Sequence, residues 1–267
     1  MKRLYEQERL STTQIGEIFQ TSRSVINYNL KKLNVNIRPR GKKFNIDTVK
    51  DKLNTPEFEY FLGILATDGS ICNNIIALEF SEENKEILDH WNNFLGGNMN
   101  INIHTNAKGM DYYKITFQDF EFSKILESYG ITPKKSYTLE LSYINWNILL
   151  GIFDGDGSLS IDTRHGISGK FRIASGSEIF LKQIQEFLKQ NNIKSSIYKD
   201  SHSKCMSLTV GILQDIVSIY NNIYKDSSYF LKRKYDKFGP LLEKFNSSNS
   251  VNSVNERENS KTEPSLE

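Results

Sequence analysis

The sequence predicts an α+β fold in which one α-β-β-α-β-β-α unit occurs twice, after a small all-helical N-terminal segment. An apolar stretch over residues 61–71 (FLGILATDGSI) returns over residues 149–159 (LLGIFDGDGSL), and both copies end in Asp-Gly-Ser and an aliphatic residue. Predicted helices and strands follow the two copies in the same order. Residues 1–43 differ from the rest, because they hold ten Lys or Arg against three Glu, a net charge of +7 in a chain of net charge +2.

The composition indicates a folded protein without membrane segments. The chain has 267 residues, 38% of them hydrophobic and 12% aromatic, which suffices for one large domain or two smaller ones. It contains no run of about 18 apolar residues and starts with charged residues, so we expect no membrane partner and an intracellular protein. That location would be the cytoplasm or nucleoid of a bacterium or phage-infected cell, or an organelle matrix. The two cysteines, Cys72 and Cys205, are far apart in the sequence, which argues against a disulfide or zinc framework.

Residues 1–35 predict a helix-turn-helix. Ser11 and Gln14 match a capping box before the first helix of the pair, and Ser22 can cap the second. The turn has Gln20 where such motifs often have glycine. The alternative is a generic cap of three helices. On one face of each helix we expect the apolar residues Ile15, Ile18, Phe19, Ile26, Leu30 and Leu33. The outward residues of the second helix, suited to base edges and phosphates, are Arg23, Ser24, Asn27 and Lys31.

A basic linker is predicted over residues 36–54. Pro39 and Gly41 interrupt helix formation, and four cations fall within six residues. An extended basic segment can follow a phosphate backbone or lie in a minor groove, and the alternative is an ordinary solvated linker. The four cations are Arg38, Arg40, Lys42 and Lys43.

The two repeats are predicted over residues 55–142 and 143–245. Thr55, followed by proline, caps the first helix of one repeat, and Asn145 caps the corresponding helix of the other. From residue 246 to 267 the chain is rich in Ser and Asn and charged, so we expect a disordered tail.

Each repeated stretch places a carboxylate at the end of an apolar helix. Small residues four positions apart form a flat stripe along each helix, which would let the two helices pack closely and set Asp68 beside Asp156. Two adjacent carboxylates repel unless cations lie nearby, and magnesium suits a site of one or two carboxylates with room for water and phosphate oxygens. The small residues are Gly63, Thr67, Gly151 and Gly155.

The two stretches resemble the LAGLIDADG motif of homing endonucleases, in the single-chain form with two motifs. The resemblance covers about residues 55–238. It implies a saddle of two four-stranded antiparallel sheets in the DNA major groove and double-strand cleavage at a long, partly tolerant site. It also implies a monomer that binds double-stranded DNA and uses Mg²⁺ (or Mn²⁺). The basic N-terminal segment would lengthen the DNA footprint.

The resemblance also assigns metal-binding residues by position. Asp68 and Asp156 match the metal-binding carboxylates of the family, and the carbonyls of Thr67 and Gly155 often help in binding. The motif copies differ at their sixth position, which is alanine in the first and Asp154 in the second. Since this position is not the catalytic carboxylate, we expect the difference to matter little.

Four further residues are catalytic candidates by the same resemblance. Lys135 and Lys234 match the basic residue after the last helix of each repeat, which polarises solvent or stabilises charge in the transition state. Asn84 and Ser177 match the polar position that orders active-site water, although serine is short for this role. Alternatives to the two lysines are their neighbours Lys134 and Lys232. Sheet cations that could contact bases or phosphates, or form an ordinary polar sheet face, are Lys114, Arg164, Lys170, Arg172 and Lys199.

Two other functions fit the same fold. A maturase would bind intron RNA and help its splicing, and a transcription regulator would bind DNA without cutting it. The intact Asp68 and Asp156 argue against the regulator. The sequence therefore favours a metal-dependent DNA endonuclease with an N-terminal DNA-binding segment.

Overall fold

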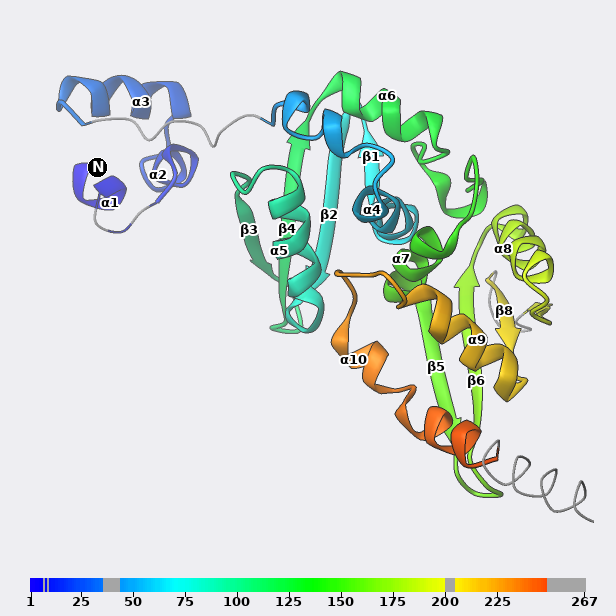
Figure 1. Cartoon of the computed structure of the whole chain (residues 1–267). Coiled ribbons are helices and arrows are strands. Elements are labelled where there is room, and N and C mark those ends of the chain that lie inside the picture. Colours follow the sequence, from blue (N-terminus) through cyan, green and yellow to red (C-terminus); the bar gives the residue numbers. More distant parts are fainter. Residues whose placement is uncertain (7, 9, 36–43, 200–204, 249–267) are drawn as a thin grey trace, which may run out of the picture. The chain divides into compact units, whose positions relative to one another are not determined.

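The structure is a computed structural model that describes residues 1–6, 8, 10–35, 44–199 and 205–248. The chain divides into two compact units, Met1–Lys43 and Phe44–Glu267 (Figure 1). The cations predicted at Arg38, Arg40, Lys42 and Lys43 lie outside the described residues.

The N-terminal unit contains the helices α1 (Lys2–Glu6), α2 (Thr12–Ile18) and α3 (Arg23–Lys32). Ser11 forms the predicted capping box of α2, because its hydroxyl accepts from the Gln14 amide at 3.2 Å and its own amide donates to the Gln14 side chain at 2.9 Å. These side chains satisfy amide groups that have no partner within the helix. The buried apolar residues of the unit are Tyr5, Ile15, Ile26, Leu30 and Val35.

In the turn between α2 and α3, Gln20 takes the place of the glycine that such turns often contain. Gln20 has a φ of 50°, the left-handed conformation that glycine usually adopts in such turns. The tight approach is made by Gly16 instead, where a Cβ would lie 2.7 Å from the carbonyl oxygen of Thr21. Ser22 caps α3 as predicted. The predicted apolar faces are wrong in part, because so small a unit buries little of its surface and leaves exposed Ile18, Phe19 and Leu33.

The second unit consists of two repeats with the same order of elements. The first contains α4 (Pro56–Thr67), β1 (Ser70–Cys72), β2 (Ile75–Ser81), α5 (Lys85–Phe94), β3 (Ile101–Thr105), β4 (Asp111–Gln118) and α6 (Phe120–Ser128). The second contains α7 (Trp146–Asp156), β5 (Gly157–Asp162), β6 (Ser168–Ser175), α8 (Glu178–Gln190), β7 (Ser196–Lys199), β8 (Met206–Val210) and α9 (Leu213–Ile223), and α10 (Lys232–Asp236) follows. This order confirms the predicted fold.

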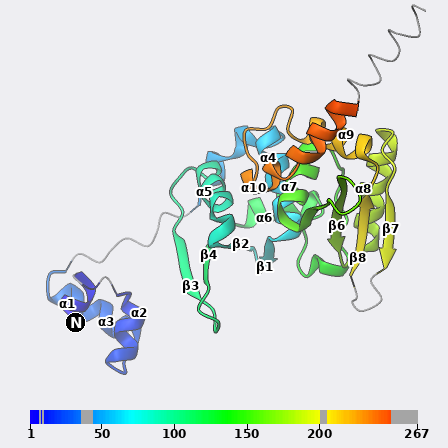
Figure 2. The ribbon, with the colours of Figure 1, turned by 90° about the horizontal axis from the view of Figure 1, so that it is seen from below.

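Each repeat forms a four-stranded antiparallel sheet. The strand orders are β1-β2-β4-β3 and β5-β6-β8-β7, so the two sheets have equivalent topology. Helix α5 packs against β2 and β4, and α8 and α9 pack against β6. In the view of Figure 2, helices α5 and α9 lie on one side of the strands of their repeats. Alternate strand residues are buried under these helices and the others face outward, as expected for sheets with one covered face.

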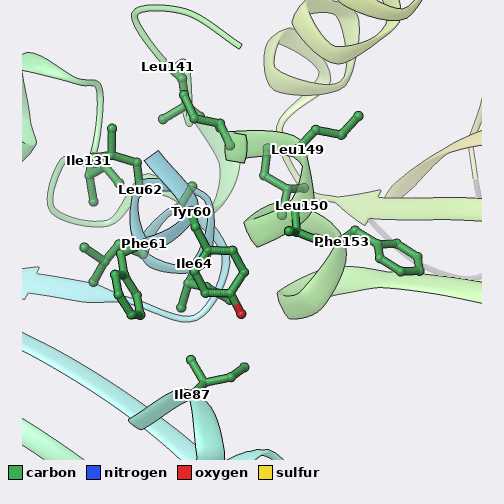
Figure 3. Packing of buried hydrophobic residues seen from close by; sticks show 14 of the residues in the cluster. Tyr60, Phe61, Leu62, Ile64, Ile87, Ile131, Leu141, Leu149, Leu150 and Phe153 are labelled. Carbon is green, nitrogen blue, oxygen red and sulfur yellow. The ribbon is translucent and has the colours of Figure 1, made fainter. Parts of the chain in front are cut away.

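Helices α4 and α7 lie side by side at the centre of this unit and share one apolar core with both sheets (Figures 1 and 3). Each helix reaches its own repeat with an aromatic ring. Phe61 on α4 lies 4.9 Å from the ring of Trp91 on α5, and Phe153 on α7 stacks 4.8 Å from Phe171 on β6. The pair of helices therefore joins the two sheets through one packed core.

Residues 44–54 differ from the predicted linker. Phe44 and Val49 belong to the core of the second unit, and the ring of Phe44 lies 4.5 Å from that of Phe117. The segment contains two 3₁₀ turns, Ile46–Thr48 and Lys50–Lys52. Apolar residues three or four positions apart bury one side of it, a pattern that the neighbouring cations obscure in the sequence.

At the C-terminal end, residues 239–248 are helical, so the start of the predicted disordered tail, over 246–248, is ordered; residues 249–267 lie outside the described part. None of the described helices has the length and apolar character needed to cross a membrane.

Candidate active site

The site is built on the contact between α4 and α7. A Cβ on Gly151 would lie 2.9 Å from the backbone nitrogen of Ile64 and would collide with the carbonyl of Tyr60. A Cβ on Gly63 would lie 2.7 Å from the nitrogen of Ile152. The two backbones therefore touch, and only glycine fits at these two positions.

The close packing continues to the ends of the helices, where the two motif aspartates lie. A Cβ on Gly155 would lie 2.5 Å from Oδ2 of Asp68, so this carboxylate sits against the backbone of the opposite helix. Asp68 follows the last residue of α4 and accepts from the Thr67 hydroxyl at 2.9 Å, and Asp156 is the last residue of α7. Both aspartates keep exposed surface, although the surrounding protein shields their carboxylates from much of the solvent.

Two buried lysines flank the aspartates. The Lys234 amine donates to the carbonyls of Phe153 at 2.6 Å and Gly157 at 2.7 Å, and also to those of Asp154 and Gly155. The Lys135 amine donates to the carbonyl of Gly69. Their neighbours Lys134 and Lys232 are exposed, and Lys232 pairs with an aspartate one turn later in α10. The structure therefore brings Lys135 and Lys234, and not their neighbours, to the site.

The four groups influence one another's charge across the two repeats. Burial raises the pKa of Asp156 to about 6, with a further rise from the charge of Asp68, and burial also raises the pKa of Asp68. Both lysines oppose these shifts. Burial lowers the pKa of Lys234 to about 8 and also lowers that of Lys135, while the carboxylates raise both. Two carboxylates that are hard to ionise together make a site that favours a bound cation.

A divalent metal would find two carboxylates here and would need other ligands. Over the described residues, no group of three or more His, Cys, Asp or Glu could hold an ion by itself. Asp68 and Asp156 are nevertheless exposed, and their oxygens are the donors that Mg²⁺ prefers while it keeps water or phosphate oxygens in its remaining positions. The donor set thus fits Mg²⁺ or Mn²⁺ completed by a substrate phosphate. The Gly155 carbonyl, predicted as a ligand, accepts from Lys234 at 3.2 Å instead.

Comparisons with known proteins identify the fold. Residues 145–229 match the family model of a LAGLIDADG-like domain. A double mutant of I-SmaMI has a similar structure, with a TM-score of 0.51 and 16% sequence identity over 76% of this chain and 96% of that chain. The LAGLIDADG homing endonuclease I-GzeII in complex with its DNA target is similar with a TM-score of 0.50 and 16% identity, over 73% of this chain and 92% of that one. The chain has the two-motif LAGLIDADG fold.

A third LAGLIDADG structure, I-SmaMI bound to an uncleaved DNA target with calcium ions, is similar with a TM-score of 0.50 and 15% identity, over 74% of this chain and 92% of that one. A comparison with curated protein sequences gave no match. The first and second LAGLIDADG helices of this chain are α4 and α7.

The two residues predicted to order water have other contacts. Ser177 is fully buried and caps α8, and its hydroxyl donates to the Leu139 carbonyl at 2.7 Å. The Ser177 hydroxyl is therefore buried and engaged within the protein. Asn84 lies before α5 and accepts from Arg233 at 2.7 Å, and Arg233 precedes Lys234. Asn84 therefore contacts the segment that carries a site lysine, although it is engaged through an arginine of the other repeat.

Three of the five predicted sheet cations point to the uncovered sheet faces. Lys114 pairs with Glu79 at 3.0 Å, and Arg172 donates to the Ser207 hydroxyl at 2.9 Å. Lys170 lies on the same face as Arg172, two residues away on β6. Lys199 lies on the other face of its sheet. It is two residues from Ile197, which pairs with the buried Leu208 of β8, so both residues of β7 face the covered side. The fifth cation, in the loop after β5 and paired with Asp162, is Arg164.

On α3, the predicted contact residues Arg23, Ser24 and Lys31 are exposed. Asn27 is half-buried, and its Oδ1 is buried with no hydrogen-bond partner among the described residues. Sequence reasoning missed Tyr28, which is 59% exposed at the middle of the outward face of α3 and carries the Lys32 amine 4.8 Å from its ring centre. The sequence contained a signal for this residue, because Tyr28 lies one helical turn from Ser24 and from Lys31, which are both predicted to face outward.

Proposed function

We propose that the protein is a site-specific double-strand DNA endonuclease of the homing type, dependent on Mg²⁺ or Mn²⁺. The observation that carries this proposal is the meeting of Asp68 and Asp156 at the open end of two touching helices, with Lys135 and Lys234 beside them. The fold agrees with it, since I-GzeII is in complex with a DNA target.

The proposed chemistry is hydrolysis of one phosphodiester in each DNA strand. Asp68 and Asp156 would hold the metal, which supplies Lewis-acid polarisation of the phosphate and a water of lowered pKa. The charges of Lys135 and Lys234 act on both aspartates, so these lysines would also stabilise negative charge that develops on a phosphate bound there. The exposed surface of both aspartates would let a phosphate of the substrate approach them. We further propose that the protein acts as a monomer, because one chain contributes both carboxylates.

The N-terminal unit would extend the DNA contact as a helix-turn-helix. Its support is the turn conformation at Gln20, the exposed basic residues of α3 and the +7 charge of residues 1–43. Phosphate contacts from such a segment add affinity that falls with salt.

The test is selection of cleaved sites from a randomised duplex library, with magnesium and with calcium in its place. We expect one discrete cut site that requires magnesium, with binding retained in calcium. The test variants Asp68→Asn and Asp156→Asn keep the side-chain shape and remove the charge. Each should lower cleavage by about 10²–10³-fold while DNA is still bound. Cleavage by both variants at the wild-type rate would overturn the proposal. Specific binding without cutting would instead favour a regulator, and preference for folded intron RNA would favour a maturase.

A further inference from the structure

Asp154 is a buried carboxylate within the second LAGLIDADG helix, at the position that Ala66 occupies in the first. Its side chain is fully buried among apolar residues of α7. A carboxylate in such a place is costly unless hydrogen-bond donors or cations compensate it. The sequence suggested no role for this residue, so its contacts are informative.

Two donors from distant parts of the chain converge on one oxygen of Asp154. Oδ2 accepts from the Tyr60 hydroxyl at 3.0 Å and from the Leu231 amide at 2.8 Å. Tyr60 belongs to α4 of the first repeat, and Leu231 directly precedes α10. The other oxygen, Oδ1, has no hydrogen-bond partner among the described residues. Asp154 thus joins the helix pair to the start of α10.

The segment that Asp154 holds is the one that carries Lys234. The Lys234 amide donates to the Leu231 carbonyl at 2.9 Å, so the two residues share one turn. The Lys234 amine in turn donates to the backbone carbonyl of Asp154 at 2.8 Å. Asp154 therefore contacts this turn twice, with its side chain at the beginning and with its carbonyl at the lysine amine.

Charge reinforces the geometry. The carboxylates of Asp154, Asp68 and Asp156 stabilise the buried ammonium of Lys234, with Asp154 having the largest effect, and the charge of Arg233 opposes them. Removal of the Asp154 charge would leave only Asp68 and Asp156 to balance the ammonium of Lys234 against the guanidinium of Arg233. The first repeat differs, because Ala66 has no carboxylate and the Lys135 amine contacts the Gly69 carbonyl.

We propose that Asp154 is a positioning residue that fixes the turn from Leu231 to Lys234 and thereby holds the Lys234 amine at the end of α7. The two repeats then place their lysines by different means, and loss of Asp154 disturbs only one of them. The consequence for DNA cleavage rests on the proposed endonuclease function, whereas the positioning itself does not.

Chemical labelling of lysines tests the positioning without any activity. Native wild-type protein and variants are treated with an acetylating reagent, and the rates at Lys135 and Lys234 are followed by mass spectrometry. In wild type both amines are buried and we expect slow labelling. In Asp154→Ala, Lys234 should react about tenfold faster or more, because a buried hydrogen-bonded anchor is lost, while Lys135 changes less than about twofold.

Three further variants separate positioning from general loosening. Leu188→Ala opens a cavity in α8 without touching the Lys234 turn, so it should accelerate both lysines equally or neither. Asp154→Asn keeps the shape but not the charge and should accelerate Lys234 by less than Asp154→Ala. Tyr60→Phe removes one donor and should have the smallest effect. The two mild substitutions keep the test available if Asp154→Ala does not fold. Equal acceleration of Lys135 and Lys234 in the Asp154 variants, or no acceleration, would overturn the proposal.

Plasmid cleavage then measures the consequence for each DNA strand. On a supercoiled plasmid with the selected site, Asp154→Asn should accumulate nicked circles with one strand intact, and end-labelling should show the same strand intact every time. If Asp154→Asn slows the cleavage of both strands equally, the claim that Asp154 positions only Lys234 would be overturned. If wild-type protein cuts no DNA, the endonuclease proposal fails, and the labelling ratio of Lys234 to Lys135 still decides the role of Asp154.

Discussion

The first and second repeats run through the same series of helices and strands, yet the surroundings of their lysines differ. The Lys234 amine lies within hydrogen-bond distance of four backbone carbonyls, in a turn held by Asp154, whereas the Lys135 amine donates to the carbonyl of Gly69. The contact between α4 and α7 is by contrast alike from both sides, with a glycine of each helix against the backbone of the other. Where two backbones touch, neither repeat can change alone. A long lysine side chain, by contrast, can reach a backbone carbonyl in more than one way, so each repeat can hold its lysine differently.

The shared helix contact predicts the largest loss of stability. Gly63→Ala and Gly151→Ala should each lower the free energy of unfolding by about 3 kcal/mol, because the added methyl group meets backbone atoms that cannot move aside. Chemical unfolding followed by tryptophan fluorescence measures this. Gly211→Ala is the control, since a Cβ there meets no atom within 4 Å, and it should be neutral or slightly stabilising. Tolerance of alanine at Gly63 or Gly151 would show that the helices can separate.

The unequal lysine contacts predict unequal costs of removing them. Lys234→Met should lower the free energy of unfolding by about 1–2 kcal/mol more than Lys135→Met, because the three N–H donors of Lys234 are shared among four carbonyls within reach, whereas Lys135 contacts the carbonyl of Gly69. Urea unfolding of the two variants under identical conditions gives the difference. Methionine keeps the length and most of the apolar stem, so lost packing contributes little. Equal costs would mean that the two lysines are held alike.

The raised pKa of Asp156 predicts a pH dependence of the metal-free protein. The folded-state pKa of about 6 lies above the ordinary value of 3.8, so the folded state binds a proton that the unfolded state has lost between these pH values. Asp156 should therefore make its full contribution to the free energy of unfolding below pH 4 and lose it as pH rises through 6. The loss should be on the order of 1 kcal/mol, because solvent partly screens this carboxylate.

Thermal unfolding between pH 4.5 and 7 checks this, with chelator and with magnesium. Magnesium should raise the Tm at pH 7 and have less effect at pH 5, since protons compete for the same carboxylate. Asp154, whose pKa burial raises to about 6, contributes in the same direction. Asp156→Asn should therefore remove only part of the dependence and most of the magnesium effect. A Tm that is unchanged by magnesium in wild type would argue against a metal at these carboxylates.

The N-terminal unit predicts the smallest effect on chemistry and a clear effect on DNA affinity. Deletion of residues 1–43 should weaken binding and reduce the slope of log affinity against log salt by several units, without removing cleavage. Within the full chain, Lys31→Ala should reduce that slope by about 1, whereas Tyr28→Phe should leave the slope unchanged. Fluorescence anisotropy at several salt concentrations provides the slopes. A deletion variant with the wild-type slope would remove this unit from the DNA contact.

Much of the fold could be predicted from the sequence because its signals are local. The helix caps at Ser11, Ser22, Thr55 and Asn145 depend on atoms three residues away, and all four form as predicted. The repeated stretch and its small residues also indicated the helix pair, since helical periodicity places such residues on one face. For the same reason the two motif aspartates could be expected at the helix ends.

The chain itself thus determined the repeats, the helix ends and the aspartates, through interactions within a few residues. Tertiary structure decided what no local pattern contains. It selected Lys135 and Lys234 over their neighbours, turned Lys199 to the covered side of its sheet, and gave Asp154 a partner 77 residues away at Leu231. These outcomes follow from how distant segments meet when the core closes, because burial and hydrogen-bond partners of a side chain are set by whatever packs against it.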